Sequence, residues 1–268
     1  MREFSGRTAF ITGGASGIGL AMARAFADKG MRLVLSDVNK AALDAAESEL
    51  KPRTDVLVLA QDVTDRAAWA EAVSQVEAFG KLHVVCANAG LPPAGSPVAD
   101  TDPAKWDRIV AVNLTGVFNT VHYLTPLVRA HGEGGHVVIT SSMAGAVAAS
   151  PIGDYVVTKY GAVGMGEVMR YELAPHNIGV SLLLPGTVGT ALSGAPTPGS
   201  MNAANVGARV VKAIEGNELY IFTHPEYRPM VEARCNAVLA AFGESAQPGF
   251  QEPDKVMEMM RQNAYGAP

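Results

Sequence analysis

The feature of this chain that most constrains its fold is a repeated alternation of short apolar runs with longer helix-like segments. Seven runs have the length of a strand and are rich in valine, isoleucine and leucine; they cover 8–12, 32–36, 55–60, 82–87, 136–141, 179–184 and 219–223. None shows the alternating polarity of a half-exposed sheet, which predicts strands buried on both faces. The segments between them are long enough for helices, namely 17–29, 40–50, 66–79, 103–129, 154–175 and 203–215. This order predicts an α/β fold, with a doubly wound parallel sheet of about seven strands and helices on both faces.

Composition narrows the class of protein. The 268 residues are 48 % hydrophobic and 18 % charged, which is enough for a large core. The net charge is −5 and no basic cluster occurs, so neither nucleic acid nor an anionic membrane is an expected partner. An apolar strand-like run begins almost at the N-terminus, no run is long enough for a membrane span, and only two cysteines occur. We therefore expect a cytoplasmic protein with no metal site, folded as one domain over 1–268, in which about 224–268 form a C-terminal helical extension.

A glycine-rich turn follows the first predicted strand. In TGGASGIG, residues 12–19, glycines 13, 17 and 19 stand between a strand and a helix. Glycine lets a backbone approach a pyrophosphate closely, and the start of a helix offers unpaired N–H groups to the phosphates. This context predicts a dinucleotide site at Gly13, Ser16, Gly17, Ile18 and Gly19, although the spacing differs from G-x-G-x-x-G and a purely structural turn is the alternative.

Asp37 stands at the end of the second predicted strand, eighteen residues after Gly19. A carboxylate there can accept hydrogen bonds from the hydroxyls of an adenosine ribose, and it would repel a 2′-phosphate. Ser16, Ser36 and Val38 nearby are not basic. Asp37 therefore favours NAD over NADP, although it could instead, or in addition, cap the next helix.

The segment YVVTK places Tyr155 and Lys159 four residues apart, on one face of a predicted helix. Oxidation of an alcohol needs a base near the hydroxyl group, and tyrosine, with an ordinary pKa of about 10, is a poor base at neutral pH. A cation one helical turn away favours the phenolate and lowers that pKa. The pair therefore predicts a tyrosine general base or acid whose ionisation is assisted by a lysine.

Together these motifs resemble those of the short-chain dehydrogenase/reductase family, in its short single-domain branch. The resemblance runs from about residue 5 to residue 225 and includes TGGASGIG, Asn88-Ala89-Gly90, VNLTG, ITSSMAG, YVVTK and LPGTVGT. It implies a Rossmann-type fold and an NAD-dependent enzyme that interconverts a secondary alcohol and its ketone. The catalytic residues that it implies are Asn113, Ser142, Tyr155 and Lys159.

The resemblance also implies individual roles. Ser142, rather than its neighbour Ser141, would hydrogen-bond the substrate oxygen, Asn113 would support a proton-relaying water, and Lys159 would hold the nicotinamide ribose. Asp62 and Val63 would flank the adenine, although Asp62 could instead cap the next helix, just as Asn113 and Thr190 could be turn or cap residues. Thr190 would hold the carboxamide. The further cofactor-binding residues would be Asn88, Ala89, Gly90, Pro185, Gly186 and Val188.

Two departures bear on these expectations. Ala87 stands where the family commonly has a second asparagine, so one polar contact near the cofactor is missing. Gly161, Gly164 and Gly166 follow Lys159, and such small residues let another helix approach closely. The family often packs this helix against a symmetry mate, so we expect a homo-oligomer, a tetramer or a dimer; packing within one chain is the alternative.

Three predicted loops, 91–99, 143–153 and 188–203, would choose the substrate. They contain small or apolar side chains and no lysine or arginine, which favours an apolar, alicyclic or aromatic alcohol over a charged one. Within the third, 191–202 has the composition of a mobile lid. Two alternatives remain: a reductase of 3-oxoacyl groups on an acyl carrier protein, which Asp37 disfavours, and a non-catalytic NAD-sensing protein, which the presence of Tyr155 and Lys159 disfavours.

Overall fold

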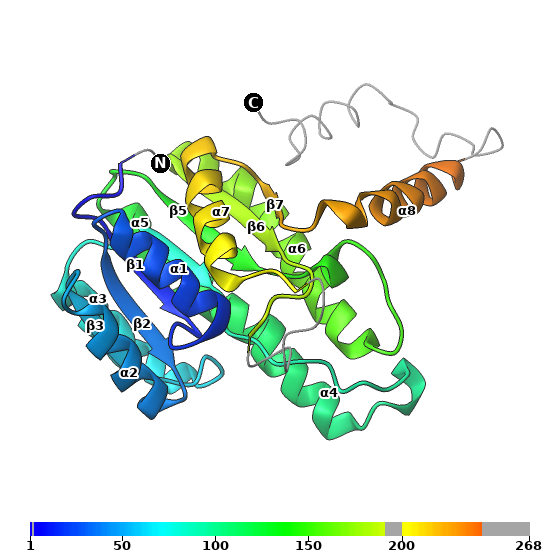
Figure 1. Cartoon of the computed structure of the whole chain (residues 1–268), viewed down its shortest axis with the longest axis horizontal. Coiled ribbons are helices and arrows are strands. Elements are labelled where there is room, and N and C mark those ends of the chain that lie inside the picture. Colours follow the sequence, from blue (N-terminus) through cyan, green and yellow to red (C-terminus); the bar gives the residue numbers. More distant parts are fainter. Residues whose placement is uncertain (2, 191–199, 243–268) are drawn as a thin grey trace, which may run out of the picture.

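The computed structural model describes residues 1, 3–190 and 200–242, and its centre is one parallel sheet of seven strands in the order β3-β2-β1-β4-β5-β6-β7 (Figure 1). All the pairings are parallel, so every connection between paired strands is a crossover. The order reverses at β1 and β4, which makes the carboxyl ends of these two strands the switch point of the fold. The strands are β1 Thr8–Thr12, β2 Arg32–Asp37, β3 Val56–Ala60, β4 Val84–Ala87, β5 Gly135–Thr140, β6 Ile178–Leu184 and β7 Tyr220–Phe222.

Helices cover both faces of the sheet (Figure 1). Side chains of α1, α2 and α7 pack into one apolar core, and side chains of α3, α5 and α6 pack into a second core on the opposite face. The expected doubly wound, Rossmann-type architecture is confirmed. The helices are α1 Gly17–Asp28, α2 Lys40–Leu50, α3 Arg66–Phe79, α4 Pro103–Val110, α5 Gly116–Ala130, α6 Gly153–Leu173, α7 Ala203–Gly216 and α8 Arg228–Ala240.

The helix expected over 103–129 is interrupted in the middle. A π-helical turn, Ala111–Thr115, separates α4 from α5. Asn113 lies in this turn, where its amide makes two hydrogen bonds to the backbone of Leu91 in the loop after β4. The extra residue of a π turn is a common way to aim one side chain out of a continuous helix, and here it aims Asn113 at the loop beside the pocket.

The expected C-terminal extension begins with α8, none of whose residues is buried. Figure 1 shows α8 projecting away from the sheet and its covering helices. Residues 243–268 lie outside the described part of the chain, as does most of the predicted lid, because 191–199 are not described. That residues 1–268 form one domain stays a prediction.

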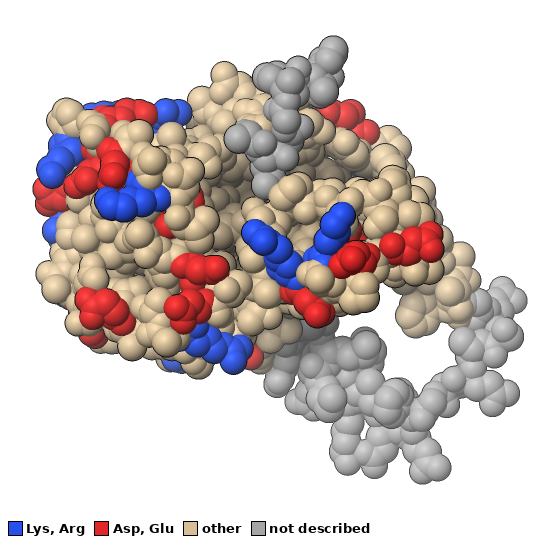
Figure 2. All heavy atoms as spheres, turned by 90° about the horizontal axis from the view of Figure 1, so that it is seen from below, with Lys and Arg blue, Asp and Glu red and all other residues tan. Residues whose placement is uncertain are grey.

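Among the described helices, none combines the length and the apolar character that a membrane span requires. Figure 2 looks onto the lower face of the molecule, where acidic and basic side chains are interspersed beside a central hollow.

His136 in β5 makes the stability of the fold sensitive to acid. Its ring is buried, Nε2 lies 2.8 Å from the Ser181 hydroxyl oxygen, and Nδ1 has no partner among the described residues. Burial, with smaller contributions from the N-terminal amine and Arg170, lowers the pKa of His136 to about 3. The unfolded chain, with a histidine pKa of about 6.5, therefore binds a proton that the folded chain does not bind as pH falls below that value.

We accordingly expect the free energy of unfolding to fall by about 2 kcal/mol between pH 7.5 and pH 5 on account of His136 alone. Urea unfolding of the wild type and of His136→Gln at the two pH values measures the contribution, because glutamine can still donate to Ser181 but does not titrate. An equal loss in both proteins would show that His136 does not carry this sensitivity.

Candidate active site

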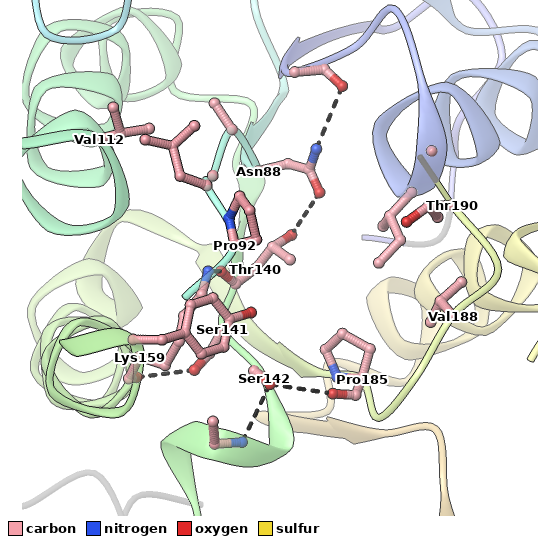
Figure 3. A pocket seen from close by; sticks show the side chains of 18 of the residues that line it. Asn88, Pro92, Val112, Thr140, Ser141, Ser142, Lys159, Pro185, Val188 and Thr190 are labelled. Carbon is pink, nitrogen blue, oxygen red and sulfur yellow. Dashed lines mark hydrogen bonds between the residues drawn. The ribbon is translucent and has the colours of Figure 1, made fainter. Parts of the chain in front are cut away.

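The functional residues predicted from the sequence surround a cavity of about 600 Å³ at the carboxyl ends of the strands (Figure 3). All of them line it except two, Gly19 and Asn113, which lie directly behind its wall. Several strands and the loops that follow them contribute residues, as expected for an open α/β sheet with a ligand at its switch point. The predicted residues that line the cavity are Gly13, Ser16, Gly17, Ile18, Asp37, Asp62, Val63, Asn88, Ala89, Gly90, Ser142, Tyr155, Lys159, Pro185, Gly186, Val188 and Thr190.

The start of α1 has the features of a phosphate site. Ser16 is its N-cap residue but makes no side-chain capping hydrogen bond, whereas α2, α3, α4 and α7 are each capped by an asparagine or aspartate side chain. The N–H groups of the first turn are therefore left for a ligand. Gly17 adopts a positive φ of 51°, and a Cβ on Gly19 would collide with the carbonyl oxygen of Gly13. The residues present fit a dinucleotide pyrophosphate.

Asp37 ends β2 at the rim of the cavity. Its carboxylate accepts hydrogen bonds from the backbone N–H groups of Ala15, at 3.4 Å, and Asn39, at 3.0 Å. Asn39, not Asp37, caps α2, because its side-chain oxygen accepts from the N–H of Ala42. The capping role considered for Asp37 therefore belongs to Asn39, and the Asp37 carboxylate lies beside the glycine turn.

Asp62 follows the same pattern. Asp65 caps α3, accepting from the N–H groups of Ala67 and Ala68, whereas Asp62 accepts from the N–H and hydroxyl of Thr64. Asp62 is exposed at the cavity and Val63 beside it is buried. The suggested helix-cap role for Asp62 is wrong, and its place at the adenine end stays a prediction.

Asn88 connects the two strands on either side of β4. Its side-chain nitrogen donates to the carbonyl of Thr12 at 3.0 Å. Its side-chain oxygen accepts from the Thr140 hydroxyl at 3.0 Å (Figure 3). The Thr12 hydroxyl in turn accepts from the N–H groups of Asn88 and Ala89. The Asn88 side chain thus holds the ends of β1 and β5 in place around the floor of the cavity.

Tyr155 and Lys159 both lie on α6 and line the cavity, as expected. The Lys159 ammonium lies 5.3 Å from the centre of the Tyr155 ring and donates a hydrogen bond to the carbonyl of Thr140 at 3.1 Å. Lys159 is only 3 % exposed, and burial lowers its pKa to about 8. An amine with this pKa can exchange protons near neutral pH.

The pKa of Tyr155 differs from the expectation. Burial raises it, and a side-chain hydrogen bond with Ser142 lowers it by a smaller amount. Because the Lys159 ammonium hydrogen-bonds the Thr140 carbonyl rather than the phenol, its charge does not outweigh the loss of water around Tyr155. Lys159 alone therefore does not lower the pKa of Tyr155 below its ordinary value, and a further positive charge near the phenol is needed.

The structure distinguishes the two adjacent serines. Ser141 is buried and donates its hydroxyl to the carbonyl of Lys159 at 2.8 Å, so it holds α6 against β5. Ser142 accepts from the N–H of Ala144 at 3.1 Å and lines the cavity (Figure 3). The serine thirteen residues before Tyr155 is therefore the one that does not hold α6 in place, and its contact with a substrate stays a prediction.

Asn113 lies behind this group. It is fully buried, its side-chain oxygen accepts from the N–H of Leu91 at 2.7 Å, and its nitrogen donates to the carbonyl of Leu91 at 3.0 Å. A Cβ added to Gly90 would lie 3.4 Å from that oxygen and 3.6 Å from the Lys159 nitrogen. Gly90 thus leaves a narrow gap through which Asn113 and Lys159 approach each other.

Comparison with known proteins decides the family. The family profile described as short chain dehydrogenase matches residues 7–199, which is more than half of the chain. The protein is a member of the short-chain dehydrogenase family.

Its similarity to individual short-chain dehydrogenases extends beyond the matched segment. It is 29 % identical to the C alpha-dehydrogenase of Sphingobium sp. SYK-6, over 95 % of this chain and 91 % of the relative. It is 33 % identical to the cyclohexanol dehydrogenase of Acinetobacter sp. SE19, over 71 % and 76 % of the two chains. Among solved structures, a short-chain dehydrogenase/reductase of Burkholderia phymatum in complex with NAD superposes with a TM-score of 0.84 at 29 % identity, over 93 % and 100 % of the chains.

The lining of this short-chain dehydrogenase includes residues that the sequence did not indicate. Arg108 on α4 lines the cavity, although the three loops expected to choose the substrate contain no basic residue. Tyr227, the N-cap residue of α8, and Met230 in its first turn line it as well, so the beginning of the C-terminal extension borders the site. Arg108 stands five residues before Asn113, a spacing that an α-helix does not place on one face, so helical periodicity gave no signal for it. Nothing in the sequence indicates the direction of α8 either.

A second group of polar side chains lies apart from the lining residues. His83, His131 and Glu133 have potential ligand atoms within 4.8 Å of one another. His83 Nε2 already lies 3.1 Å from a Glu133 oxygen, and His131 Nε2 lies 2.7 Å from the carbonyl oxygen of Leu82. That the protein has no metal site stays a prediction.

Proposed function

We propose that this short-chain dehydrogenase is an NAD-dependent oxidoreductase that interconverts a secondary alcohol and its ketone. The observation that supports the proposal most is that Tyr155, Lys159 and Ser142 line one cavity, in which the Lys159 nitrogen lies 5.3 Å from the centre of the Tyr155 ring. A base, a neighbouring cation and a hydroxyl that can bind the substrate oxygen are the groups that alcohol oxidation needs.

The dinucleotide would be held along the switch point of the sheet. The N–H groups at the start of α1 would bind its pyrophosphate, Asp37 its adenosine ribose, and Lys159 its nicotinamide ribose. Thr190 would bind the carboxamide, and Asp62 and Val63 would flank the adenine. The chemistry that the cofactor supplies when bound is acceptance of a hydride from the carbinol carbon.

The chain's own residues would move the proton. Tyr155, as the phenolate, takes the proton from the alcohol hydroxyl while the carbonyl bond forms, and Ser142 donates a hydrogen bond to the substrate oxygen. Burial raises the pKa of Tyr155, so its ionisation requires positive charge nearby, from Lys159 and from an oxidised nicotinamide ring. Lys159, with a pKa of about 8, would pass the proton onward through a water supported by Asn113.

The preference for NAD rests on Asp37. Its carboxylate lies beside the glycine turn, where it would accept hydrogen bonds from ribose hydroxyls and repel a 2′-phosphate. We expect Asp37→Ala to weaken NAD binding by about tenfold, the loss of one charge-assisted hydrogen-bond partner, while binding of NADP weakens less or improves. Titration calorimetry with both dinucleotides measures the change. An unaltered ratio of the two dissociation constants would remove Asp37 from the cofactor site.

An apolar alicyclic or aromatic alcohol suits the rest of the cavity. Its substrate end would be formed by Pro92, Pro93, Met143, Val147 and Ile152, which carry no charge; Arg108 on α4 and Lys159 are the basic residues among the described residues that line the cavity. The relative named as a cyclohexanol dehydrogenase is in keeping with this class. A 3-oxoacyl reductase of acyl carrier proteins is the second candidate in the same fold, and the acidic Asp37 speaks against its usual NADP.

We further propose a cytoplasmic homo-oligomer. Gly161 and Gly166 pack against side chains of their own chain, but Gly164 has no atom within 4 Å of where its Cβ would be, so this face of α6 leaves room for a partner. The apolar residues exposed on the same helix are Val157, Val168 and Tyr171. The thiol of Cys235 is free and exposed, which suits a reducing compartment.

A further inference from the structure

The loop after β4 forms one wall of the cavity and has few backbone N–H groups that could donate hydrogen bonds to fix its position. Pro92 and Pro93 both line the cavity, and neither has a backbone N–H. Leu91 before them is held on both of its backbone groups by Asn113. The first N–H after the two prolines belongs to Ala94, so the position of the wall depends on what this group binds.

Asp154 accepts the Ala94 N–H. One carboxylate oxygen lies 2.9 Å from that nitrogen, and the side chain is 0 % exposed. The second carboxylate oxygen is buried and has no hydrogen-bond partner among the described residues. A buried carboxylate is costly, and the features that compensate for it here are the Ala94 N–H and the positive end of α6, in whose first turn Asp154 lies.

Further packing brings the loop and the start of α6 together. Val98 lies directly over Gly153, where any Cβ would collide with its side chain. The loop is therefore anchored at Leu91, at Ala94 and at Val98. The partners of the last two, Asp154 and Gly153, are consecutive residues of α6. The next residue along α6 is Tyr155.

We propose that Asp154 is a positioning residue that sets the distance between the substrate wall Pro92–Pro93 and Tyr155. The inference rests on the proposed function, because it assigns Asp154 a role in binding the alcohol. Asp154 does not touch the reacting atoms; it acts through the loop. Loss of its hydrogen bond releases the wall, so the alcohol binds less tightly, whereas the cofactor end of the cavity is unaffected.

The test compares Asp154→Ala and Asp154→Asn with the wild type. Asparagine keeps an oxygen that accepts the Ala94 N–H, whereas alanine removes the acceptor. Asp65→Ala is the matched control, because Asp65 also accepts backbone N–H groups, at the start of α3, and does not line the cavity. The measurements are kcat and KM for a neutral secondary alcohol, the Kd for NAD, and hydrogen exchange of peptides covering 91–98.

We expect Asp154→Ala to raise KM by about tenfold or more, the loss of one charge-assisted hydrogen bond, and to speed exchange over 91–98. Its Kd for NAD should stay within about twofold, while Asp154→Asn and Asp65→Ala should stay within about threefold of the wild-type KM. Unchanged KM or unchanged exchange in Asp154→Ala would overturn the proposal, as would an equal rise of KM in Asp65→Ala. Absence of turnover in the wild type would instead refute the proposed function.

Discussion

Tyr155→Phe is expected to lower kcat for alcohol oxidation by about 10²- to 10⁴-fold, the range that general acid–base catalysis contributes. Phenylalanine fills the same space on α6 but cannot accept or donate the hydroxyl proton. Rapid-mixing or steady-state formation of reduced nicotinamide, with NAD and a neutral alcohol, measures the loss.

Binding of NAD should survive this substitution with a Kd within about threefold of the wild type, because the phenol is only one of many groups along the cofactor site. A circular dichroism melt checks that the variant is folded. If Tyr155→Phe kept more than about a tenth of the wild-type kcat, another group would be the base and the proposed mechanism would be wrong.

Ser142→Ala is expected to have the second largest effect, a fall in kcat of about 10²- to 10³-fold, the loss associated with one hydrogen-bond donor at a developing charge. The hydrogen bond from Ser142 also lowers the pKa of Tyr155. Its removal should therefore move the acidic limb of the rate–pH profile for oxidation to higher pH.

Ser141→Ala is the matched control, since the two serines are adjacent. Ser141 donates to the carbonyl of Lys159 and is buried, so its loss should cost about 1 kcal/mol of folding stability while kcat stays within about threefold. A larger fall in kcat for Ser141→Ala than for Ser142→Ala would reverse the assignment of the two serines.

Much of the fold follows from local patterns in the sequence. Strands such as β1 and β5 are buried along their whole length and therefore read as unbroken apolar runs, and the starts of α2, α3 and α6 fall within a residue of expectation. No local pattern in the sequence indicates the π turn between α4 and α5. It accompanies the two hydrogen bonds between the Asn113 amide and the backbone of Leu91, which join residues 22 apart in sequence.

The candidate site shows the same division. Helix geometry was enough to predict that Tyr155 and Lys159 face one cavity, and the resemblance to the family added Ser142, which lines the same cavity. The pKa direction of Tyr155 was not foreseen, since burial depends on the whole fold. Tyr227 and Met230 were missed for the same reason: the position of the start of α8 beside the cavity depends on packing rather than on any local pattern.

The most direct test of the account is the absorbance of reduced nicotinamide after mixing the purified protein with NAD or NADP and a panel of aliphatic, alicyclic and benzylic secondary alcohols. The account predicts turnover with NAD on neutral alicyclic or benzylic alcohols, and a kcat/KM with NADP lower by about tenfold or more, as expected from repulsion between Asp37 and a 2′-phosphate. Absence of turnover across the panel, in a protein that still binds NAD, would contradict the proposed reaction.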